Sequence, residues 1–185
     1  MKRFFDILIT LLFLTSISPL LIIISSLILF IDGRPIIYKQ VRVGLKGRKF
    51  KMLKFRTMIN SSNKDDKLRL TKLGKILRRT SLDELPQFFN ILKKDMSIVG
   101  PRPLPEKIEK KINKVFRSQR RKVLPGITGL SQVNYTGRKR QLVDKVRLDI
   151  KFVNNYTLKN YFKIVLKTPL IILTRTFKNK SSIIN

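Results

Sequence analysis

The sequence predicts an α/β fold that is mostly helical, built as a single membrane-associated domain with an N-terminal apolar segment. Three patterns predict it: a long uncharged apolar run, two neighbouring β-like runs, and several amphipathic stretches with helical spacing. We therefore divide the chain into a membrane helix over residues 1–33 and a folded domain over residues 34–185, whose amphipathic surface helices lie at the membrane interface.

The composition limits the kinds of binding site and catalysis that this chain can support. The chain has 185 residues, with 41 Lys and Arg against 11 Asp and Glu, and a formal net charge of +30. Such an excess is typical of proteins with polyanionic partners, although a solvated Lys-rich surface also accounts for it. Cys and His are both absent. Their absence excludes disulfides, thiol nucleophiles, Ser-His-Asp chemistry and Cys- or His-ligated zinc.

The apolar run from Ile7 to Ile31 carries no formal charge and is long enough to cross a bilayer as a tilted helix. It lacks the cleavage pattern of a secretory signal, so we expect it to be retained. Pro19 removes a backbone donor near its middle, and basic residues flank it on both sides. A re-entrant hairpin that bends at Ser18-Pro19 satisfies both the central Pro and the positive-inside bias, and an ordinary Pro-kinked span is an equal alternative from the residues alone.

A β-hairpin is predicted after this segment. Residues Ile36–Val43 and Lys49–Met58 alternate in β-like fashion around a glycine-bounded turn at Gly44–Gly47. The alternation slips by one residue near Met52-Leu53, which indicates a β-bulge.

The remaining elements follow from spacing and from breaker residues. The patterns predict a polar, mobile loop over 60–67, a turn cluster over 125–129, and helices over 72–79, 106–122, 142–153 and 161–177.

A carboxylate pair follows the first of these helices. Pro86 fits only the first turn of a helix, so a helix begins near Asp83, and its free N–H groups favour an ionised Asp83. Ser81 and Glu84 also match a capping box, which is a purely structural role. One short helix later, the Gly-Pro-Arg-Pro loop around Arg102 suits close approach to a phosphate, or an internal pair with a carboxylate.

This combination permits phosphoryl transfer between anions. An ionised carboxylate can attack phosphorus to give an acyl phosphate, and a neighbouring carboxylate can hold Mg²⁺. A phosphate acceptor is already an anion at neutral pH, so the absence of His is no obstacle. Upstream cations add to the site: Lys54, Arg56, Arg78 and Arg79.

A series of short stretches carries a family resemblance across nearly the whole chain: RVG at 42–44, KFRTM at 54–58, LR at 77–78, SLDELPQ at 81–87, DMSIVGPRP at 95–103, PGITG at 125–129 and QVN at 132–134. In this combination and order, the chain resembles the monotopic polyprenol-phosphate phosphoglycosyl transferases, the bacterial sugar transferase family, in its short catalytic-core form.

The resemblance implies a re-entrant helix broken at Ser18-Pro19, with residues 34–185 as a catalytic domain on the cytoplasmic face of the bacterial inner (plasma) membrane. It implies that Asp83 is the nucleophile and that Glu84, with Asp83, binds Mg²⁺ or Mn²⁺. Asp83 would attack a UDP-sugar, release UMP and hold the phosphosugar. Polyprenol (undecaprenyl) phosphate would then accept the phosphosugar, in the first membrane step of polysaccharide or glycoconjugate assembly.

The resemblance also implies binding residues and partners. Anionic membrane lipids and downstream membrane glycosyltransferases are expected partners, and nucleic acid is not. The residues that match phosphate-binding positions are Arg78 and Arg102, with Lys54 and Arg56 as weaker candidates. The candidates for the nucleotide sugar are Gln132, Asn134 and Asp149.

Two departures from the family pattern bear on the sugar rather than on the reaction. Leu130 and Ser131 stand where the family has Trp followed by Ala or Ser, and Tyr135-Thr136 stand where it has Gly-Arg. Two other classes of function remain open from the residues alone. One is a basic membrane-anchored protein that binds nucleic acid or anionic lipid, and the other is a phosphatase that forms an aspartyl phosphate.

Overall fold

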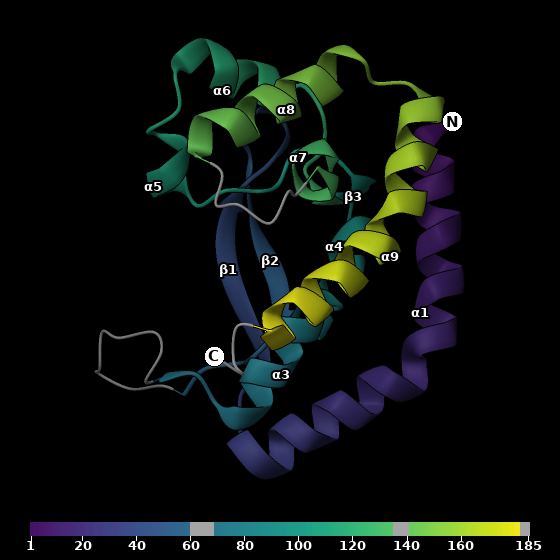
Figure 1. The fold of residues 1–185 in the computed structure, drawn as a ribbon, viewed down its shortest axis with the longest axis vertical. Coiled ribbons are helices and arrows are strands. Elements are labelled where there is room, and N and C mark those ends of the chain that lie inside the picture. The colour runs from purple at the N-terminus through teal and green to yellow at the C-terminus, as the bar shows by residue number, and fades with distance from the viewer. Residues whose placement is uncertain (60–68, 135–140, 182–185) are drawn as a thin grey trace.

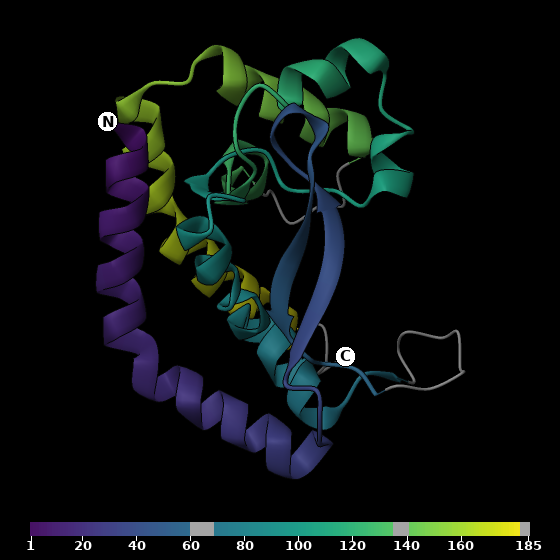
Figure 2. The ribbon, with the colours of Figure 1, turned by 180° about the vertical axis from the view of Figure 1, so that it is seen from behind.

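The computed structural model describes residues 1–59, 69–134 and 141–181, with residues 175–181 described in backbone only. The fold is mostly helical, as predicted, and its described residues form two small sheets. A bent N-terminal helix forms one side of the molecule, and a long C-terminal helix crosses from its start toward the opposite side (Figures 1 and 2). A long hairpin lies on the far side of the C-terminal helix from the first half of the N-terminal helix, and a group of short helices covers one end of that hairpin.

The strands are β1 (Ile37–Val43), β2 (Lys49–Phe55), β3 (Ser97–Val99) and β4 (Gly126–Thr128). The α-helices are α1 (Lys2–Leu27), α3 (Lys72–Thr80), α4 (Gln87–Leu92), α5 (Glu106–Glu109), α6 (Lys114–Arg120), α7 (Leu130–Val133), α8 (Leu142–Asn154) and α9 (Leu158–Ser181). Helical turns of other kinds are Ile28–Asp32, Leu45–Gly47 and Leu82–Glu84.

Helix α1 and the π-helical turn that continues it bend sharply about midway (Figure 1). Pro19 lies inside α1 and has no N–H to give to the carbonyl of Thr15. The Ser18 hydroxyl donates to that carbonyl at 2.9 Å, so the group that Pro19 leaves without a partner is satisfied. In the described part of the chain, Lys2–Asp32 is the one helix that is long and apolar enough to cross a membrane, judged by length and composition.

The start of α1 is fixed to the folded domain by a buried carboxylate. Asp6, 2% exposed, accepts hydrogen bonds from the Ser97 hydroxyl, the Ile98 backbone N–H and the Tyr161 hydroxyl at 2.8–2.9 Å. These partners belong to β3 and α9, so one side chain joins three elements. A buried carboxylate is tolerated here because three donors face it.

The far end of the apolar segment is bound to the same domain. Thr71, at the start of α3, donates from its hydroxyl to the Asp32 carboxylate at 2.9 Å. The Arg56 guanidinium donates to the backbone carbonyls of residues 32, 33 and 34. Such carbonyls have no partner within the helix, and a cation at the helix C-terminus is favourable.

The predicted hairpin is confirmed, but its predicted bulge is wrong. Strands β1 and β2 pair in an uninterrupted antiparallel register from Ile37 opposite Phe55 to Val43 opposite Lys49. The slip in alternation has another cause, because Phe50 and Met52 pack in one apolar cluster while Phe55, on the opposite face of β2, packs in a second cluster. Asn90 of α4 binds the open edge of β2. It accepts from the Leu53 N–H and donates to the Lys51 carbonyl, both at 2.9 Å.

The stretch expected to be a turn cluster at 125–129 contains a short strand. Strands β3 and β4 pair in parallel, with Ser97 opposite Gly126 and Val99 opposite Thr128. A Cβ on Gly126 would lie 2.0 Å from the backbone nitrogen of Gly100, so a side chain at this position cannot fit. This close approach places the Gly-Pro-Arg-Pro loop directly beside β4.

The helices predicted over 72–79, 142–153 and 161–177 are confirmed as α3, α8 and α9. The single helix predicted over 106–122 is wrong, because the structure divides it into α5 and α6. Asn113 has a non-helical backbone, with ψ 139°, and it starts α6 by accepting from the Val115 N–H at 2.9 Å, so one continuous helix cannot pass through this residue. The loop predicted over 60–67 lies outside the described residues.

Two apolar clusters hold these elements together. The larger lies between β2, α4, β3 and α9, and its most buried members are Ile91, Met96, Val99 and Tyr161. The smaller joins the second half of the apolar segment to the hairpin and α3 through Ile24, Ile28, Phe55 and Leu77. Because members of the N-terminal segment belong to this cluster, the segment is part of the fold.

Candidate active site

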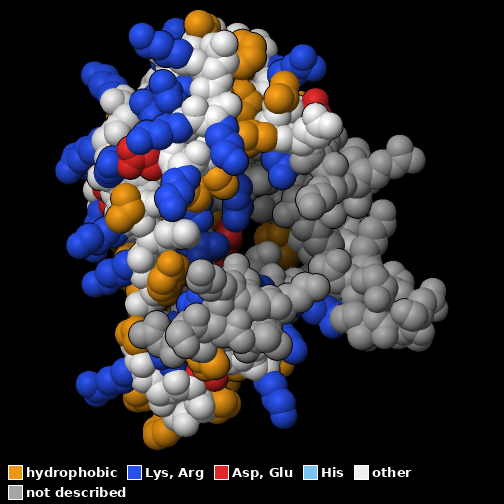
Figure 3. All heavy atoms as spheres, turned by 90° about the vertical axis from the view of Figure 1, so that its left-hand side faces the viewer, with side chains coloured by type: hydrophobic (Ala, Val, Ile, Leu, Met, Phe, Trp, Pro, Cys, Tyr) orange, Lys and Arg blue, Asp and Glu red, His pale blue; other side chains and the backbone are white. Residues whose placement is uncertain are grey.

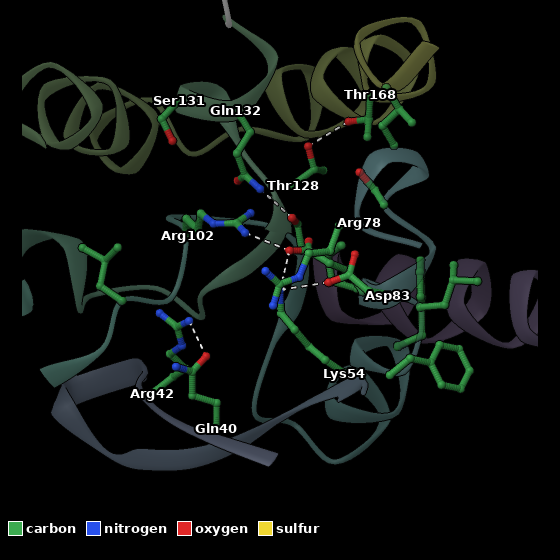
Figure 4. Close-up of a pocket in the computed structure, with 18 of the residues that line it drawn as sticks. Gln40, Arg42, Lys54, Arg78, Asp83, Arg102, Thr128, Ser131, Gln132 and Thr168 are labelled. Carbon is green, nitrogen blue, oxygen red and sulfur yellow. Dashed lines mark hydrogen bonds and ion pairs between the residues drawn. The ribbon is translucent and has the colours of Figure 1, made fainter. Parts of the chain in front are cut away.

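An open pocket of about 2110 Å³ lies between the hairpin, α4, α7 and α9, and it contains the carboxylate pair (Figure 4). One part of its lining is polar and mostly cationic, and includes Arg42, Lys54, Arg78 and Arg102. Another part is apolar and includes Ile9 and Phe13 of α1, Phe88 of α4 and Ile172 of α9. The pocket therefore offers both a charged and an apolar surface to a ligand.

The turn that presents the carboxylates departs from the predicted capping box. Ser81 ends α3 with φ +60°, and residues Leu82–Glu84 form a single 3₁₀ turn before α4. Ser81 makes no side-chain capping bond, and the Glu84 side chain turns away to contact Lys54. Pro86 precedes α4 directly, which agrees with its placement at a helix start.

Glu84 is held between two cations from distant parts of the chain. Its Oε1 accepts from Lys54 Nζ at 2.7 Å and from the Arg102 guanidinium at 2.8 Å. Burial raises the pKa of the Glu84 carboxyl, but Arg102 and Lys54 more than offset burial and bring that pKa down to about 2. Glu84 is therefore ionised throughout the neutral range.

Asp83 is in a different environment although it is adjacent. It is 6% exposed, and its Oδ2 lies 3.6 Å from Lys54 Nζ, beyond ordinary hydrogen-bond distance. Burial raises the pKa of the Asp83 carboxyl above its ordinary value, with Lys54 opposing that rise. The pKa values of the two neighbouring carboxyls are therefore shifted in opposite directions, and the Asp83 carboxylate is the less stabilised of the two anions.

The other predicted phosphate-binding residues take different positions. Arg78 lines the pocket beside Asp83, and its Nε donates to the Thr57 hydroxyl at 2.9 Å (Figure 4). The guanidinium of Arg56, at the pocket margin, is engaged with the carbonyls of residues 32–34. Arg78 and Arg102 are both exposed, and 47% of the Arg102 side chain is accessible.

The predicted nucleotide-sugar residues separate into two groups. Gln132 and Asp149 line the pocket, whereas Asn134 is not among its lining residues and bonds back to the Leu130 carbonyl at 3.0 Å. Gln132 donates to the Ile127 carbonyl at 2.7 Å. Asp149 is 3% exposed and pairs with Arg120 at 3.0 Å, so its carboxylate is engaged inside the protein.

Sequence reasoning missed two basic residues of the pocket. Arg42 of β1 lies on the side of the pocket that Arg102 enters, and it donates to Gln40 and to the Pro103 carbonyl (Figure 4). Its place in the Arg-Val-Gly stretch was a usable signal. No sequence signal distinguished Arg120, because it is one of many basic residues between 107 and 122.

The donor set fits a hard divalent cation bound together with a substrate. Asp83 and Glu84 both line the pocket, and Mg²⁺ is commonly held by one or two carboxylates while phosphates and water complete its shell. Within residues 1–59, 69–134 and 141–174, no group of three or more acidic side chains could hold a metal alone. Substrate phosphates would have to supply further ligands.

The remaining cations cover the outside of the molecule. Figure 3 shows Lys and Arg gathered over the part of one face that carries α5 and α6, with few acidic side chains among them. The surface is thus strongly cationic even away from the pocket.

Comparison with known proteins identifies relatives of the whole chain. Residues 1–175 match the family described as bacterial sugar transferase. The chain is 37% identical to a UDP-glucose:undecaprenyl-phosphate glucose-1-phosphate transferase of Klebsiella pneumoniae, over 98% of this chain and 41% of that protein. It is 38% identical to the uncharacterized sugar transferase EpsL of Bacillus subtilis, over 85% of this chain and 79% of that protein. It is 39% identical to an undecaprenyl-phosphate galactose phosphotransferase of Salmonella typhimurium, over 95% of this chain and 41% of that protein.

Proposed function

The chain belongs to the bacterial sugar transferase family, and on that premise we propose that it transfers a sugar phosphate from a UDP-sugar to undecaprenyl phosphate. The observation that carries the proposal is the buried Asp83 beside Glu84 in a pocket with both cationic and apolar lining. The chain spans less than half of the Klebsiella and Salmonella relatives, so their activity guides the proposal and does not define it.

The proposed reaction has two displacements at one phosphorus atom. An Asp83 carboxylate oxygen attacks the sugar-bearing phosphorus of the UDP-sugar, and the bond from that phosphorus to UMP breaks. The product is an acyl phosphate that links Asp83 to the sugar phosphate. A phosphate oxygen of undecaprenyl phosphate then attacks the same phosphorus and displaces the Asp83 carboxylate, giving undecaprenyl diphosphate sugar.

The basic residues would stabilise charge at the phosphates during both steps. Lys54 lies within 3.6 Å of both carboxylates, so it can move between Glu84 and a phosphate oxygen near Asp83. Arg102 is half-exposed and offers the remaining donors of its guanidinium fork to an incoming phosphate. Glu84 holds both cations in place while leaving Asp83 outside hydrogen-bond distance of Lys54.

We further propose that Asp83 and Glu84 hold Mg²⁺, or Mn²⁺ in its place, together with the diphosphate. When bound, the cation would neutralise negative charge on the diphosphate and its leaving group. The protein residues retain their own tasks: Asp83 as nucleophile, and Glu84 as the anchor for the two cations.

The membrane side of the proposal rests on exposed apolar surface. Side chains of α9 that point away from the core include Leu166, Leu170 and Leu173, which are 54–74% exposed. Half of the residues of α1 are likewise exposed. We propose that these surfaces enter one leaflet from the cytoplasmic face of the inner membrane, where the cationic surface also favours anionic lipids and where downstream membrane glycosyltransferases could take the product.

The direct test is UMP release from a panel of UDP-sugars, with and without undecaprenyl phosphate. We expect sustained UMP release for at least one sugar only when undecaprenyl phosphate is present, with one diphosphate-linked lipid formed per UMP. Release of inorganic phosphate to water would instead identify a phosphatase. No turnover with any UDP-sugar would contradict the proposed function, as would activity that is independent of the lipid.

The proposed topology predicts that both ends of the apolar segment lie on the cytoplasmic side. A straight helix over Lys2–Asp32 would separate the ends of the segment by about 45 Å. Yet one end is bound to the folded domain through Asp6, and the other end is bound to the same domain through Arg56. Single cysteines in place of Lys2 or Arg34 should therefore react with a membrane-impermeant maleimide only after the membrane is permeabilised, so that the reagent reaches the cytoplasmic face. The chain has no native Cys to confuse the result.

The matched control removes the helix break. Replacing Ser18 with Ala and Pro19 with Leu restores a donor to Thr15 and should favour a straight span, moving one end to the outside. Labelling of the Lys2→Cys variant from outside in the otherwise unchanged segment would show that the chain crosses the membrane.

A further inference from the structure

The Gly-Pro-Arg-Pro loop is held through its carbonyl groups. Prolines at 101, 103 and 105 have no N–H, so the loop can donate few backbone hydrogen bonds. Instead it accepts them from three surrounding elements. The Pro101 carbonyl accepts from Gly126 N–H at 3.0 Å, and the Leu104 carbonyl accepts from Val43 N–H at 3.2 Å. Between these, the Arg102 carbonyl accepts from the Arg120 guanidinium at 2.8 Å.

Arg120 itself is fixed by two buried carboxylates. It is 5% exposed, and its Nε donates to Asp149 at 3.0 Å while a terminal nitrogen donates to Glu109 at 3.2 Å. Glu109 and Asp149 are each 3% exposed and come from α5 and α8. Burial raises the pKa of the Asp149 carboxyl, and Arg120 opposes that rise. The planar fork of Arg120 thus joins α5, α6 and α8 to the backbone of the loop.

This arrangement has a consequence for Arg102. The Arg102 side chain is half-exposed at the mouth of the pocket, and it reaches Glu84 at 2.8 Å. Its backbone lies between two prolines whose φ angles are restricted. The carbonyl contact from Arg120 therefore fixes the peptide from which the Arg102 side chain departs toward Glu84.

We propose that Arg120, with Glu109 and Asp149, is a positioning residue that orients Arg102 for the phosphates of the substrate. Arg120 acts through the loop and touches no reacting atom in this role. The kinetic test of this inference rests on the proposed function, because it measures transfer from the UDP-sugar. Asp149 accordingly serves as the anchor of Arg120, whereas the family resemblance had implied a ligand for the nucleotide sugar at this position.

Arg121 supplies a matched control because, within the described residues, its guanidinium hydrogen-bonds to the same Glu109 and not to the loop. Its guanidinium donates to the second Glu109 oxygen, and its side chain is 29% exposed. Arg120→Lys and Arg121→Lys each keep the positive charge beside Glu109. Lys cannot reproduce a fork that donates in three directions, so only the first change should free the Arg102 carbonyl.

We expect Arg120→Lys to lower kcat/KM for the UDP-sugar by about 10-fold or more, and Arg121→Lys to change it less than about 2-fold. The decisive test is a double-mutant cycle with Arg102→Met. If Arg120 acts through Arg102, adding Arg120→Lys to Arg102→Met should cause little further loss. Full additivity of the two losses would overturn the inference, as would equal kinetics of the two Lys variants.

A second measurement needs no turnover. Hydrogen exchange of the Gly126 and Val43 amides, which donate to the Pro101 and Leu104 carbonyls of the loop, should be faster in Arg120→Lys than in the wild type or in Arg121→Lys. Unchanged exchange would overturn the inference even in an active enzyme, and faster exchange would support it even if no UDP-sugar were a substrate. Should Arg120→Lys fail to fold, Asp149→Asn removes one anchor of the same guanidinium and carries the same expectations.

Discussion

Replacing Asp83 with Asn should reduce turnover by at least about 10³-fold, because the amide cannot act as the nucleophile in the proposed displacement. Incubation of the wild type with a UDP-sugar alone should leave one phosphosugar on the peptide that contains Asp83. Intact-protein and peptide mass spectrometry measure that adduct, and UMP release measures turnover. The Asn variant should form no adduct under the same conditions.

The Asn variant should remain folded, which makes the loss of activity interpretable. Burial raises the pKa of the Asp83 carboxyl in the folded chain. A group with a raised pKa stabilises the folded state below its unfolded pKa, and that contribution is lost as the pH rises through the folded pKa. At neutral pH the neutral amide should therefore not lower the melting temperature. Full activity in Asp83→Asn would contradict the assignment of the nucleophile.

Removal of divalent cations should abolish UMP release, and Mg²⁺ or Mn²⁺ should restore it. The physical reason is that carboxylates and phosphates are hard oxygen ligands, and His and Cys are absent from the chain. Glu84→Gln should raise the Mg²⁺ concentration needed for half-maximal activity, or remove activity. Titration of Mg²⁺ into EDTA-treated enzyme, with UMP release as the readout, measures both effects.

Glu84 also holds Lys54 and Arg102, so a control must separate metal binding from the loss of that anchor. Its pKa of about 2 means that the ionised carboxylate stabilises the fold above its unfolded pKa, and that this contribution is lost as the pH falls toward 2. Glu84→Gln should therefore melt at a lower temperature at neutral pH, with the difference shrinking in acid. Undiminished turnover of the wild type in a chelator would contradict the metal requirement, whatever Glu84→Gln does.

Local patterns were sufficient for the parts of the fold that depend on neighbouring residues. The alternation on either side of Gly44–Gly47 predicted the hairpin, because side chains of successive strand residues point to opposite faces. The helical spacing in α3, α8 and α9 was equally clear. Asp83 and Glu84 could be picked out because they are adjacent and stand before Pro86, where the chain has to start a new helix.

Other features were decided by contacts between distant segments. The break between α5 and α6 arises where Asn113 caps a helix inside an amphipathic pattern that looked continuous. Strand β4 exists because Gly126 permits its backbone to approach Gly100, and a three-residue strand carries no alternation to detect. The apparent bulge in β2 is the point where the strand passes from one apolar cluster, which holds Phe50 and Met52, to the other, which holds Phe55.

The sequence by itself determined the carboxylate pair, the apolar segment with its central Pro19, and the family to which the chain belongs. Only the tertiary structure decided how the environments of the two carboxylates differ. Lys54 lies 30 residues before Glu84, and Arg102 lies 18 after it, so no local pattern reports that both cations meet one carboxylate. Burial and charge act through space, and they set the pKa of each carboxyl according to neighbours that only the folded chain brings together.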